Sequence, residues 1–347
     1  MSFEFIPTRV FYESGVLDYP LGKTLVERFQ RMGVTVTPTA SHNRITGIPG
    51  NTPAAAYREA KRTLVIGVRR SETFQSCKPS AHYQLPLVTS CPGMCEYCYL
   101  ATTLGKKPYV RVYVNLEEIL GIASNLIQER LPEITQFEGA ATSDPVPVER
   151  YTGVLKQAIE FFGCESNGRF RFVTKYTDVD SLLEAKHEGH TRFRFSLNCE
   201  EVVNKFEHGT PSPEERIIAS GKVLSAEYPL GFIIAPIFRF EGWQEAYRRL
   251  MERSAEELAK RAPYGWSSEQ LTLEFISHRF TSKAKANILG VFPNSSLSME
   301  EEGRKFKYGQ FGYGKYIYQP EEMKEMKEFF SEQAKCYFPL ARVEYFV

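Results

Sequence analysis

The chain is organised around one stretch of sequence, Thr89-Ser90-Cys91-Pro92-Gly93-Met94-Cys95-Glu96-Tyr97-Cys98-Tyr99-Leu100. Three of the seven cysteines of the protein, Cys91, Cys95 and Cys98, lie within eight residues of one another here. Pro92 and Gly93 favour a loop over a helix at this point. Because a short loop lets three thiolates converge on one object, this stretch, which we name the cysteine loop, predicts a metal centre.

The spacing in the cysteine loop favours an iron–sulfur cluster over zinc. A 4Fe-4S cluster is normally held by four thiolates, so three thiolates leave one iron open to a small-molecule ligand. S-adenosylmethionine is held and reductively cleaved to a carbon radical at such an iron. Structural zinc sites usually show two separated ligand pairs, whereas the other cysteines are scattered singly, at Cys77, Cys164, Cys199 and Cys336.

The composition predicts a soluble globular protein. Of the 347 residues 42% are hydrophobic and 24% charged, as in ordinary globular domains. The formal charge is only +1, so any affinity for nucleic acid must come from local basic patches. The sequence shows no secretory leader and no apolar run long enough to cross a membrane. An odd number of cysteines without a leader argues against a disulfide framework and predicts a cytoplasmic location.

Apolar periodicity predicts strands that alternate with helices. Before the cysteine loop we expect helices over 21–32 and 54–61 and strands over 35–39 and 63–68. Beyond it we expect strands over 109–114, 135–140, 169–175, 192–197, 231–237 and 271–276. Helices are expected over 116–129, 148–162, 181–187, 214–227 and 243–261. Such alternation indicates parallel βαβ units and an incomplete β/α barrel, whose chemistry takes place at the C-terminal ends of its strands.

Polar residues gather at these strand ends, namely Ser143, Asp144, Lys175, Ser196 and Asn198. A cation such as Lys175 suits a carboxylate, for instance that of S-adenosylmethionine. Each residue also has a simpler interpretation. The first two can cap the following helix, the lysine can be a solvated charge, and the last two can be turn residues.

The tail combines basic and aromatic residues in a pattern typical of a β-hairpin. Arg304, Lys305 and Lys307 interleave with aromatic residues that include Tyr308, and glycines then punctuate a second run that contains Lys315. Cations would contact phosphates, and a ring would wedge in where a base is displaced. The alternative is a solvated strand pair whose tyrosines pack on the barrel.

The cysteine triplet resembles that of the radical SAM superfamily, in which an aromatic such as Tyr97 commonly lies beside the cofactor. Longer strings resemble spore photoproduct lyases in particular, and the likeness covers essentially the whole chain. These strings are 78–81, 102–105, 173–176, 192–196, 228–233, 278–281 and 313–319.

The resemblance implies a fold, a cofactor set and a reaction. It implies a partial (β/α)6-type TIM barrel over 86–290, an N-terminal α/β segment over 1–85, and a DNA-contacting hairpin with a closing segment over 291–347. The cluster would be held by Cys91, Cys95 and Cys98. The positions matching the S-adenosylmethionine pocket are Tyr99, Ser143, Lys175, Ser196 and Ala235. The activity would be DNA repair during spore germination, in which a deoxyadenosyl radical takes a hydrogen from a spore-photoproduct lesion and two thymines result.

One position departs from the family pattern. Members commonly place a hydrogen-donor cysteine just before the string Thr142-Ser143-Asp144, where this chain has Ala141. Either the chain is a donor-deficient variant, or the donor lies elsewhere. Cys77 is then the best candidate, although a free cysteine is more commonly a small buried residue. Tyr97 and Tyr99 match the tyrosines that return the radical to the cofactor, or they stack beside the cluster.

Other classes of function remain open at this point. One is a radical SAM enzyme acting on a small molecule or peptide, against which the basic aromatic tail argues. Another is a non-catalytic iron–sulfur or zinc DNA-binding protein, against which the polar strand ends argue. The expected partners are damaged double-stranded DNA and an electron donor such as a flavodoxin or ferredoxin. No sequence feature demands a partner subunit, which predicts a monomer.

Overall fold

The protein has a mixed α/β fold. The computed structural model describes residues 4–78, 80–100, 104–308 and 314–347. The chain divides into two compact units, the first formed by Met1–Gly93 with Leu104–Phe193 and the second by Met94–Thr103 with Arg194–Val347. The strings 78–81, 102–105 and 313–319 fall partly outside the described residues. None of the described helices is long and apolar enough to cross a bilayer.

The first unit contains a five-stranded sheet in the order β2-β1-β3-β8-β6. Its strands are β1 (Arg9–Glu13), β2 (Thr35–Thr39), β3 (Thr63–Gly67), β6 (Val88–Thr89) and β8 (Val110–Tyr113). The pairs β1·β2, β1·β3 and β3·β8 are parallel, and β6·β8 is antiparallel. The chain therefore leaves β1 toward β2 on one side and returns to β3 on the other, so the strand order reverses between β1 and β3.

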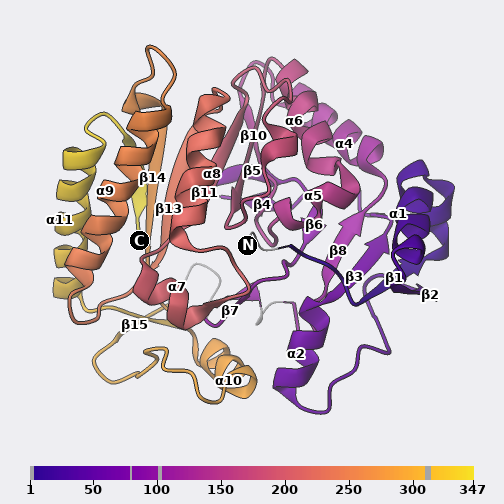
Figure 1. Cartoon of the computed structure of the whole chain (residues 1–347), viewed down its shortest axis with the longest axis horizontal. Coiled ribbons are helices and arrows are strands. Elements are labelled where there is room, and N and C mark those ends of the chain that lie inside the picture. The colour runs from indigo at the N-terminus through magenta and orange to yellow at the C-terminus, as the bar shows by residue number, and fades with distance from the viewer. Residues whose placement is uncertain (1–3, 79, 101–103, 309–313) are drawn as a thin grey trace. The chain divides into compact units, whose positions relative to one another are not determined.

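Two helices connect the first strands of this sheet, α1 (Pro20–Arg31) and α2 (Pro53–Lys61), and Figure 1 shows α1 beside β1 and β2. Leu25 and Phe29 of α1 are fully buried. Gly33, with φ +73°, follows the helix in the left-handed region that favours glycine. The helices expected over 21–32 and 54–61 are thus confirmed.

The rest of the first unit is built on the strands β4 (Ser76–Cys77), β5 (Ala81–Gln84), β9 (Thr135–Glu138) and β10 (Gly168–Thr174), in the order β10-β9-β5-β4. The pairs β5·β9 and β9·β10 are parallel. The helical segments are η1 (Ser14–Asp18), α4 (Leu116–Glu129), α5 (Val146–Thr152), α6 (Val154–Cys164) and η2 (Asp180–Leu182). Phe162 of α6 stacks on Phe170 of β10 with ring centroids 5.2 Å apart, which anchors this helix to the sheet.

Two of the helix predictions are wrong. The helix expected over 148–162 is broken into α5 and α6 by Gly153, whose φ is 63°. The helix expected over 181–187 is replaced by the single turn η2. The backbone of Lys186 packs against Gly163, where an added side chain would overlap the carbonyl oxygen of Lys186. This tertiary contact overrides the local helical preference of the segment.

The second unit is built on β13 (Leu230–Ile237), β14 (Leu271–Ser277) and β17 (Arg342–Phe346), next to the second half of β11 (Thr191–Leu197). The pairs β13·β14 and β14·β17 are parallel. The helical segments are α7 (Glu200–Phe206), α8 (Pro213–Ser225), α9 (Trp243–Arg261), η3 (Ser268–Gln270), α10 (Ser282–Val291) and α11 (Pro320–Tyr337). Figure 1 shows α9 beside α11, and Trp243 meets Phe329 across them at 5.0 Å between ring centroids.

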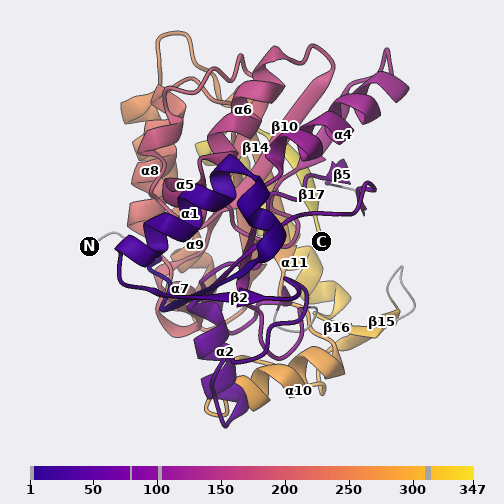
Figure 2. The same cartoon turned by 90° about the vertical axis from the view of Figure 1, so that its right-hand side faces the viewer.

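Two short antiparallel pairs complete the second unit. One joins β7 (Met94–Cys95) to β12 (Glu207–His208) and places Cys95 opposite Glu207. The other joins β15 (Lys305–Tyr308) to β16 (Gly314–Ile317), and Figure 2 shows these strands side by side, near α10. The residues that connect β15 to β16 lie outside the described part of the chain.

A buried carboxylate joins α5 to α6 and makes a pH dependence of stability testable. Glu149 accepts hydrogen bonds from the amides of Leu155 at 2.8 Å and Lys156 at 3.0 Å. Burial raises its pKa from 4.5 to about 7. A carboxyl with a raised pKa stabilises the fold fully below the unfolded pKa and loses that contribution as the pH rises through the folded pKa.

We expect the wild-type free energy of unfolding to fall by up to about 3 kcal/mol between pH 4.5 and 7 because of this group. The Glu149→Gln protein should lack that part of the fall, as measured by denaturant unfolding at several pH values. Glu129→Gln, at an exposed position at the end of α4, serves as the control and should follow the wild type. Parallel curves for wild type and Glu149→Gln would contradict the assignment.

Candidate active site

The start of the cysteine loop is held firmly within the first unit. Ser90 is fully buried with φ 66°, and its amide donates to the carbonyl oxygen of Thr142 at 2.8 Å. Ser90 also forms an isolated parallel bridge with Ser143. The buried ammonium of Lys61 donates to the carbonyl oxygen of Cys91 at 2.9 Å. The first cysteine is therefore fixed next to the loop that contains Ala141 and Ser143.

The three cysteines differ in burial. Cys95 is buried, Cys91 and Cys98 are half-buried, and all three are thiols. The amide of Cys98 donates to the carbonyl oxygen of Cys95 at 3.1 Å, which makes a tight turn. The described residues include no group of three or more His, Cys, Asp or Glu side chains placed to bind a metal ion. The assignment of these thiols to a cluster therefore depends on the chemistry of the thiol group and on their spacing in the sequence.

The two tyrosines of the cysteine loop lie in different environments. The hydroxyl of Tyr97 donates a hydrogen bond to Glu207, which in turn pairs with the fully buried Arg216 at 2.7 Å. Burial, reinforced by Glu207, raises the pKa of Tyr97 well above its ordinary value, so this phenol is protonated at neutral pH. Tyr99 is 58% exposed. Tyr97 is thus held by the internal ion pair of Glu207 and Arg216.

In the first unit, Asp144 brings the predicted residues at two strand ends together. Its buried carboxylate accepts hydrogen bonds from the hydroxyl of Thr174 at 2.8 Å and from the amide of Lys175 at 2.9 Å. It also accepts one from the amide of Val146, beside the start of α5. Burial raises the pKa of Asp144 to about 6. The carboxylate therefore serves both as a cap and as a link between Ser143 and Lys175.

In the second unit, Ser196 and Asn198 follow one another at the end of β11 with different roles. Ser196 is buried, and its carbonyl oxygen accepts a hydrogen bond from Arg216 at 3.2 Å. The side-chain Nδ2 of Asn198 donates a hydrogen bond to the carbonyl oxygen of Pro236 at 2.8 Å, and its Oδ1 accepts one from the hydroxyl of Tyr247 at 2.9 Å. The side chain of Asn198 thus links the end of β11 to β13 and α9. The predicted Ala235 is half-buried in β13.

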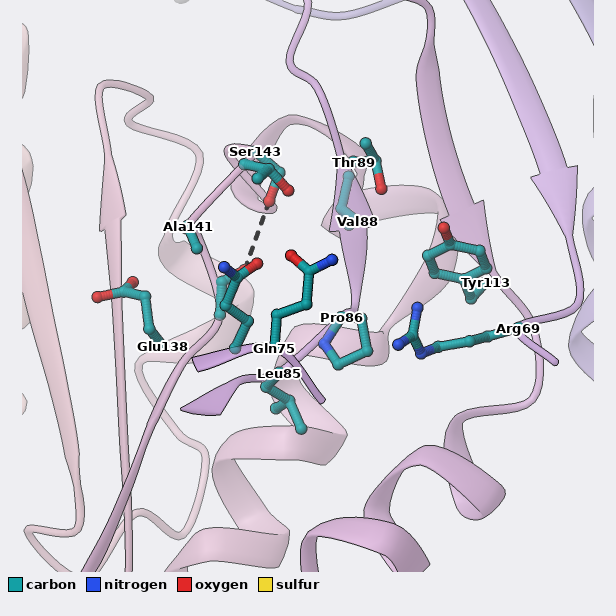
Figure 3. Close-up of a pocket in the computed structure, with 13 residues that line it drawn as sticks. Arg69, Gln75, Leu85, Pro86, Val88, Thr89, Tyr113, Glu138, Ala141 and Ser143 are labelled. Atoms are coloured by element: carbon teal, nitrogen blue, oxygen red, sulfur yellow. Dashed lines mark hydrogen bonds between the residues drawn. The ribbon is translucent and has the colours of Figure 1, made fainter. Parts of the chain in front are cut away.

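A cavity of about 160 Å³ opens in the first unit next to Ala141 (Figure 3). Figure 3 shows Ala141 and Ser143 on one side of it and Arg69 with Tyr113 on the other. Cys77 is not among its lining residues, but Gln75, two residues earlier, is. Cys77 itself is half-buried at the end of β4, opposite Ala81 of β5.

Our sequence reasoning missed Arg69 and Glu138 as lining residues of this cavity. Glu138 ends β9 and pairs with the buried Arg171 of β10 at 3.3 Å. Both residues stand where a strand ends, which is the signal that could have found them.

The tail places its predicted residues in two groups. Lys305, Lys307 and Tyr308 lie in β15 and are exposed. Lys307 stands opposite Lys315 of β16, whose pKa is lowered by burial and then by Arg279 and Lys307. Like charges directly opposite each other destabilise a strand pair, so this arrangement suits an anion. Arg304 instead packs over the ring of Tyr318, 3.7 Å from its centroid.

Comparisons with known proteins agree over the full length of the chain. The family model of spore photoproduct lyase matches residues 5–347. A spore photoproduct lyase of Clostridium acetobutylicum is 49% identical and one of Bacillus subtilis 48% identical, with 98% or more of this chain and 98% of each relative covered.

The structural comparisons give the same result. A solved structure of a spore photoproduct lyase double mutant with bound AdoMet and dinucleoside spore photoproduct is 51% identical, with a TM-score of 0.94 over 99% of each chain. Another, of the enzyme complexed with dinucleoside spore photoproduct, is 50% identical and has the same TM-score. With the cysteine loop, the polar strand ends and the adjoining cavity in place, the chain belongs to the spore photoproduct lyase family.

Proposed function

We propose that this protein splits the spore photoproduct, 5-thyminyl-5,6-dihydrothymine, into two thymines and so repairs DNA by direct reversal. The observation that carries the proposal is the likeness, over 99% of the chain, to a structure that holds both AdoMet and the dinucleoside lesion. In this chain the strand ends carry polar residues that buried partners hold in place. For example, the buried carboxylate of Asp144 accepts a hydrogen bond from the backbone amide of Lys175. A radical SAM enzyme acting on another substrate is the alternative.

The residues fit an iron–sulfur cluster and S-adenosylmethionine. Three thiols on one loop supply the donor chemistry of a cluster with an open iron. When bound, the cluster and S-adenosylmethionine would supply a carbon-centred radical by one-electron reduction. The fold that fits this chemistry is a partial (β/α)6-type barrel. Contacts to S-adenosylmethionine are assigned to Tyr99, Ser143, Lys175, Ser196 and Ala235.

The hydrogen donor of the reaction is assigned to Cys77. Once the lesion has lost a ring hydrogen and its methylene bridge has broken, a thymine-centred radical needs a hydrogen atom, and Ala141 has no weak X–H bond to give. The double mutant found in the structural comparison carries a cysteine-to-alanine and a serine-to-cysteine replacement, separated by as many residues as Cys77 and Ala141 are here. Tyr97 and Tyr99 then return the radical to the cofactor.

The tail is assigned to the opening of the damaged duplex. The exposed Lys305, Lys307 and Tyr308, with Lys315 opposite, present cations and a ring to phosphates and a displaced base. Arg304 supports the base of this strand pair through its contact with Tyr318. A monomer in the cytoplasm, reduced by a flavodoxin or ferredoxin, completes the proposal.

An anaerobic assay with the lesion dinucleotide tests the proposal. The reconstituted, chemically reduced protein should convert the lesion to the repaired thymine dinucleotide in an amount far above the S-adenosylmethionine consumed, because the cofactor is re-formed in each cycle. Chromatography of the repaired dinucleotide and of 5′-deoxyadenosine measures both quantities. Cleavage of S-adenosylmethionine without thymine release would favour the other radical SAM substrate instead.

A further inference from the structure

Three arginines lie together at one edge of the five-stranded sheet of the first unit. Arg69 and Arg70 lie just beyond the end of β3, after Val68, and Arg111 lies in β8, the neighbouring strand. We name these three the arginine cluster. A second cavity, of about 280 Å³, opens here and is lined by His42, Asn43, Arg69, Arg70, Ser71 and Tyr113.

The place of this cavity in the fold is one that commonly binds ligands. β1, β2, β3 and β8 are parallel, so the segments after β1 and β3 meet at the same edge of the sheet. From β1 the chain passes to β2 on one side of β1, and it then crosses to β3 on the other side. This reversal of direction makes a topological switch point between β1 and β3. In open α/β sheets, ligands bind in the crevice outside the carboxyl ends of the strands at such a point.

In the described part of the chain, the hydrogen bonds that Arg69 and Arg111 donate go to uncharged oxygens. Arg111 donates to neutral oxygens only, those of Asn43 at 3.0 Å and of Tyr113 and Tyr109 at 3.3 Å. Arg69 donates to the carbonyl oxygen of Thr73 at 2.8 Å. Among the described residues, no ion pair joins Arg69 or Arg111 to a carboxylate.

Glu13, the last residue of β1, lies at this edge, is only 2% exposed and has several partners. It accepts hydrogen bonds from the amides of His42 at 2.8 Å and Val68 at 3.4 Å, and it pairs with Arg70 at 3.3 Å. The side chain of Arg70 is nevertheless 65% exposed. Of the three guanidinium groups, that of Arg70 alone is paired with a carboxylate among the described residues, and this leaves positive charge for an anion from solution.

We propose that the arginine cluster binds a backbone phosphate of the DNA next to the lesion. Guanidinium groups match the geometry of phosphate oxygens and bind them in a bidentate manner. Arg69 and Tyr113 line this cavity and also the cavity that contains Ala141 and Ser143 (Figure 3). A phosphate held here therefore lies directly beside the proposed reaction site. The inference rests on the proposed function, because DNA is the polyanion that the lyase must hold.

Two substrates separate this role from catalysis, namely lesion-bearing duplex DNA and the dinucleoside lesion, which has no flanking phosphates. We expect Arg70→Gln to weaken duplex binding roughly 3- to 10-fold and to lower the slope of log K against log salt by about one. KM for the duplex should rise while kcat, and turnover of the dinucleoside, stay at the wild-type level. Fluorescence anisotropy and anaerobic kinetics on the reconstituted full-length protein measure these quantities.

Arg31→Gln is the matched control, since it removes the same charge at the exposed end of α1 and should behave as wild type. Arg70→Gln is the decisive variant, because its largely exposed side chain can be changed with little effect on folding. Wild-type duplex affinity and salt slope in Arg70→Gln would overturn the proposal, as would a parallel loss of dinucleoside turnover. If inorganic phosphate raises the melting temperature of the wild type but not of Arg70→Gln, while the duplex salt slope is unchanged, the cluster holds a free anion and the DNA assignment is wrong. Failure of the lyase function itself would appear separately, as absent dinucleoside turnover in the wild type.

Discussion

In the Cys95→Ala protein, the rates of S-adenosylmethionine cleavage and of lesion repair are expected to fall by more than about 100-fold. The reason is that the two remaining thiolates are too few to hold a 4Fe-4S cluster. Of the three proposed ligands, Cys95 is the one that is buried, and it lies opposite Glu207 in the β7·β12 pair. Iron content and the visible absorbance of the anaerobically reconstituted protein should fall together with activity.

The control for this prediction is Cys164→Ala, which removes an exposed thiol far along the sequence at the end of α6. It should keep the iron content and activity of the wild type. A colourless wild-type protein that contains zinc and no iron would refute the cluster assignment. Unchanged iron content and turnover in Cys95→Ala would remove this residue from the ligand set.

Cys77→Ala protein is expected to consume the lesion but to release abnormal adducts in place of clean thymine. In this variant, neither position 77 nor position 141 would offer a weak X–H bond to the thymine-centred radical, so this radical would react with other species. We expect the yield of clean thymine to fall about tenfold or more, with cleavage of S-adenosylmethionine retained. In D₂O the wild type should transfer one solvent-derived deuterium to thymine, because a thiol exchanges its proton with solvent, and Cys77→Ala should not.

A compensating variant sharpens this test. Ala141→Cys in the Cys77→Ala background places the thiol where family members commonly have it, beside Ser143 and the cavity of about 160 Å³, and should restore clean thymine. Cys336→Ala, at an exposed position in α11, controls for the loss of a thiol elsewhere. Clean thymine in unchanged yield from Cys77→Ala would exclude the donor role.

Much of the secondary structure was predictable because it is local. The helix over 116–129 and the helix over 243–261 are confirmed to the residue as α4 and α9, since their apolar stripes and ends are written in consecutive residues. The antiparallel pairing of β15 with β16 follows the alternating basic and aromatic residues of the tail. The loss of the helix expected over 181–187 depends on packing of the Lys186 backbone against Gly163 of α6 and could not be predicted in this way.

By itself, the sequence determined which chemical groups are available, namely three thiols on one loop, polar residues at strand ends, and alanine at position 141 with a thiol at Cys77. The tertiary structure alone decided which partners hold these groups. It paired β8 with β3 although β8 follows the cysteine loop, placed Glu207 on Tyr97, and brought Arg69 to the cavity of Ala141. The physical reason is that these contacts join residues tens of positions apart, and such contacts depend on how strands and helices pack rather than on any local pattern of residues.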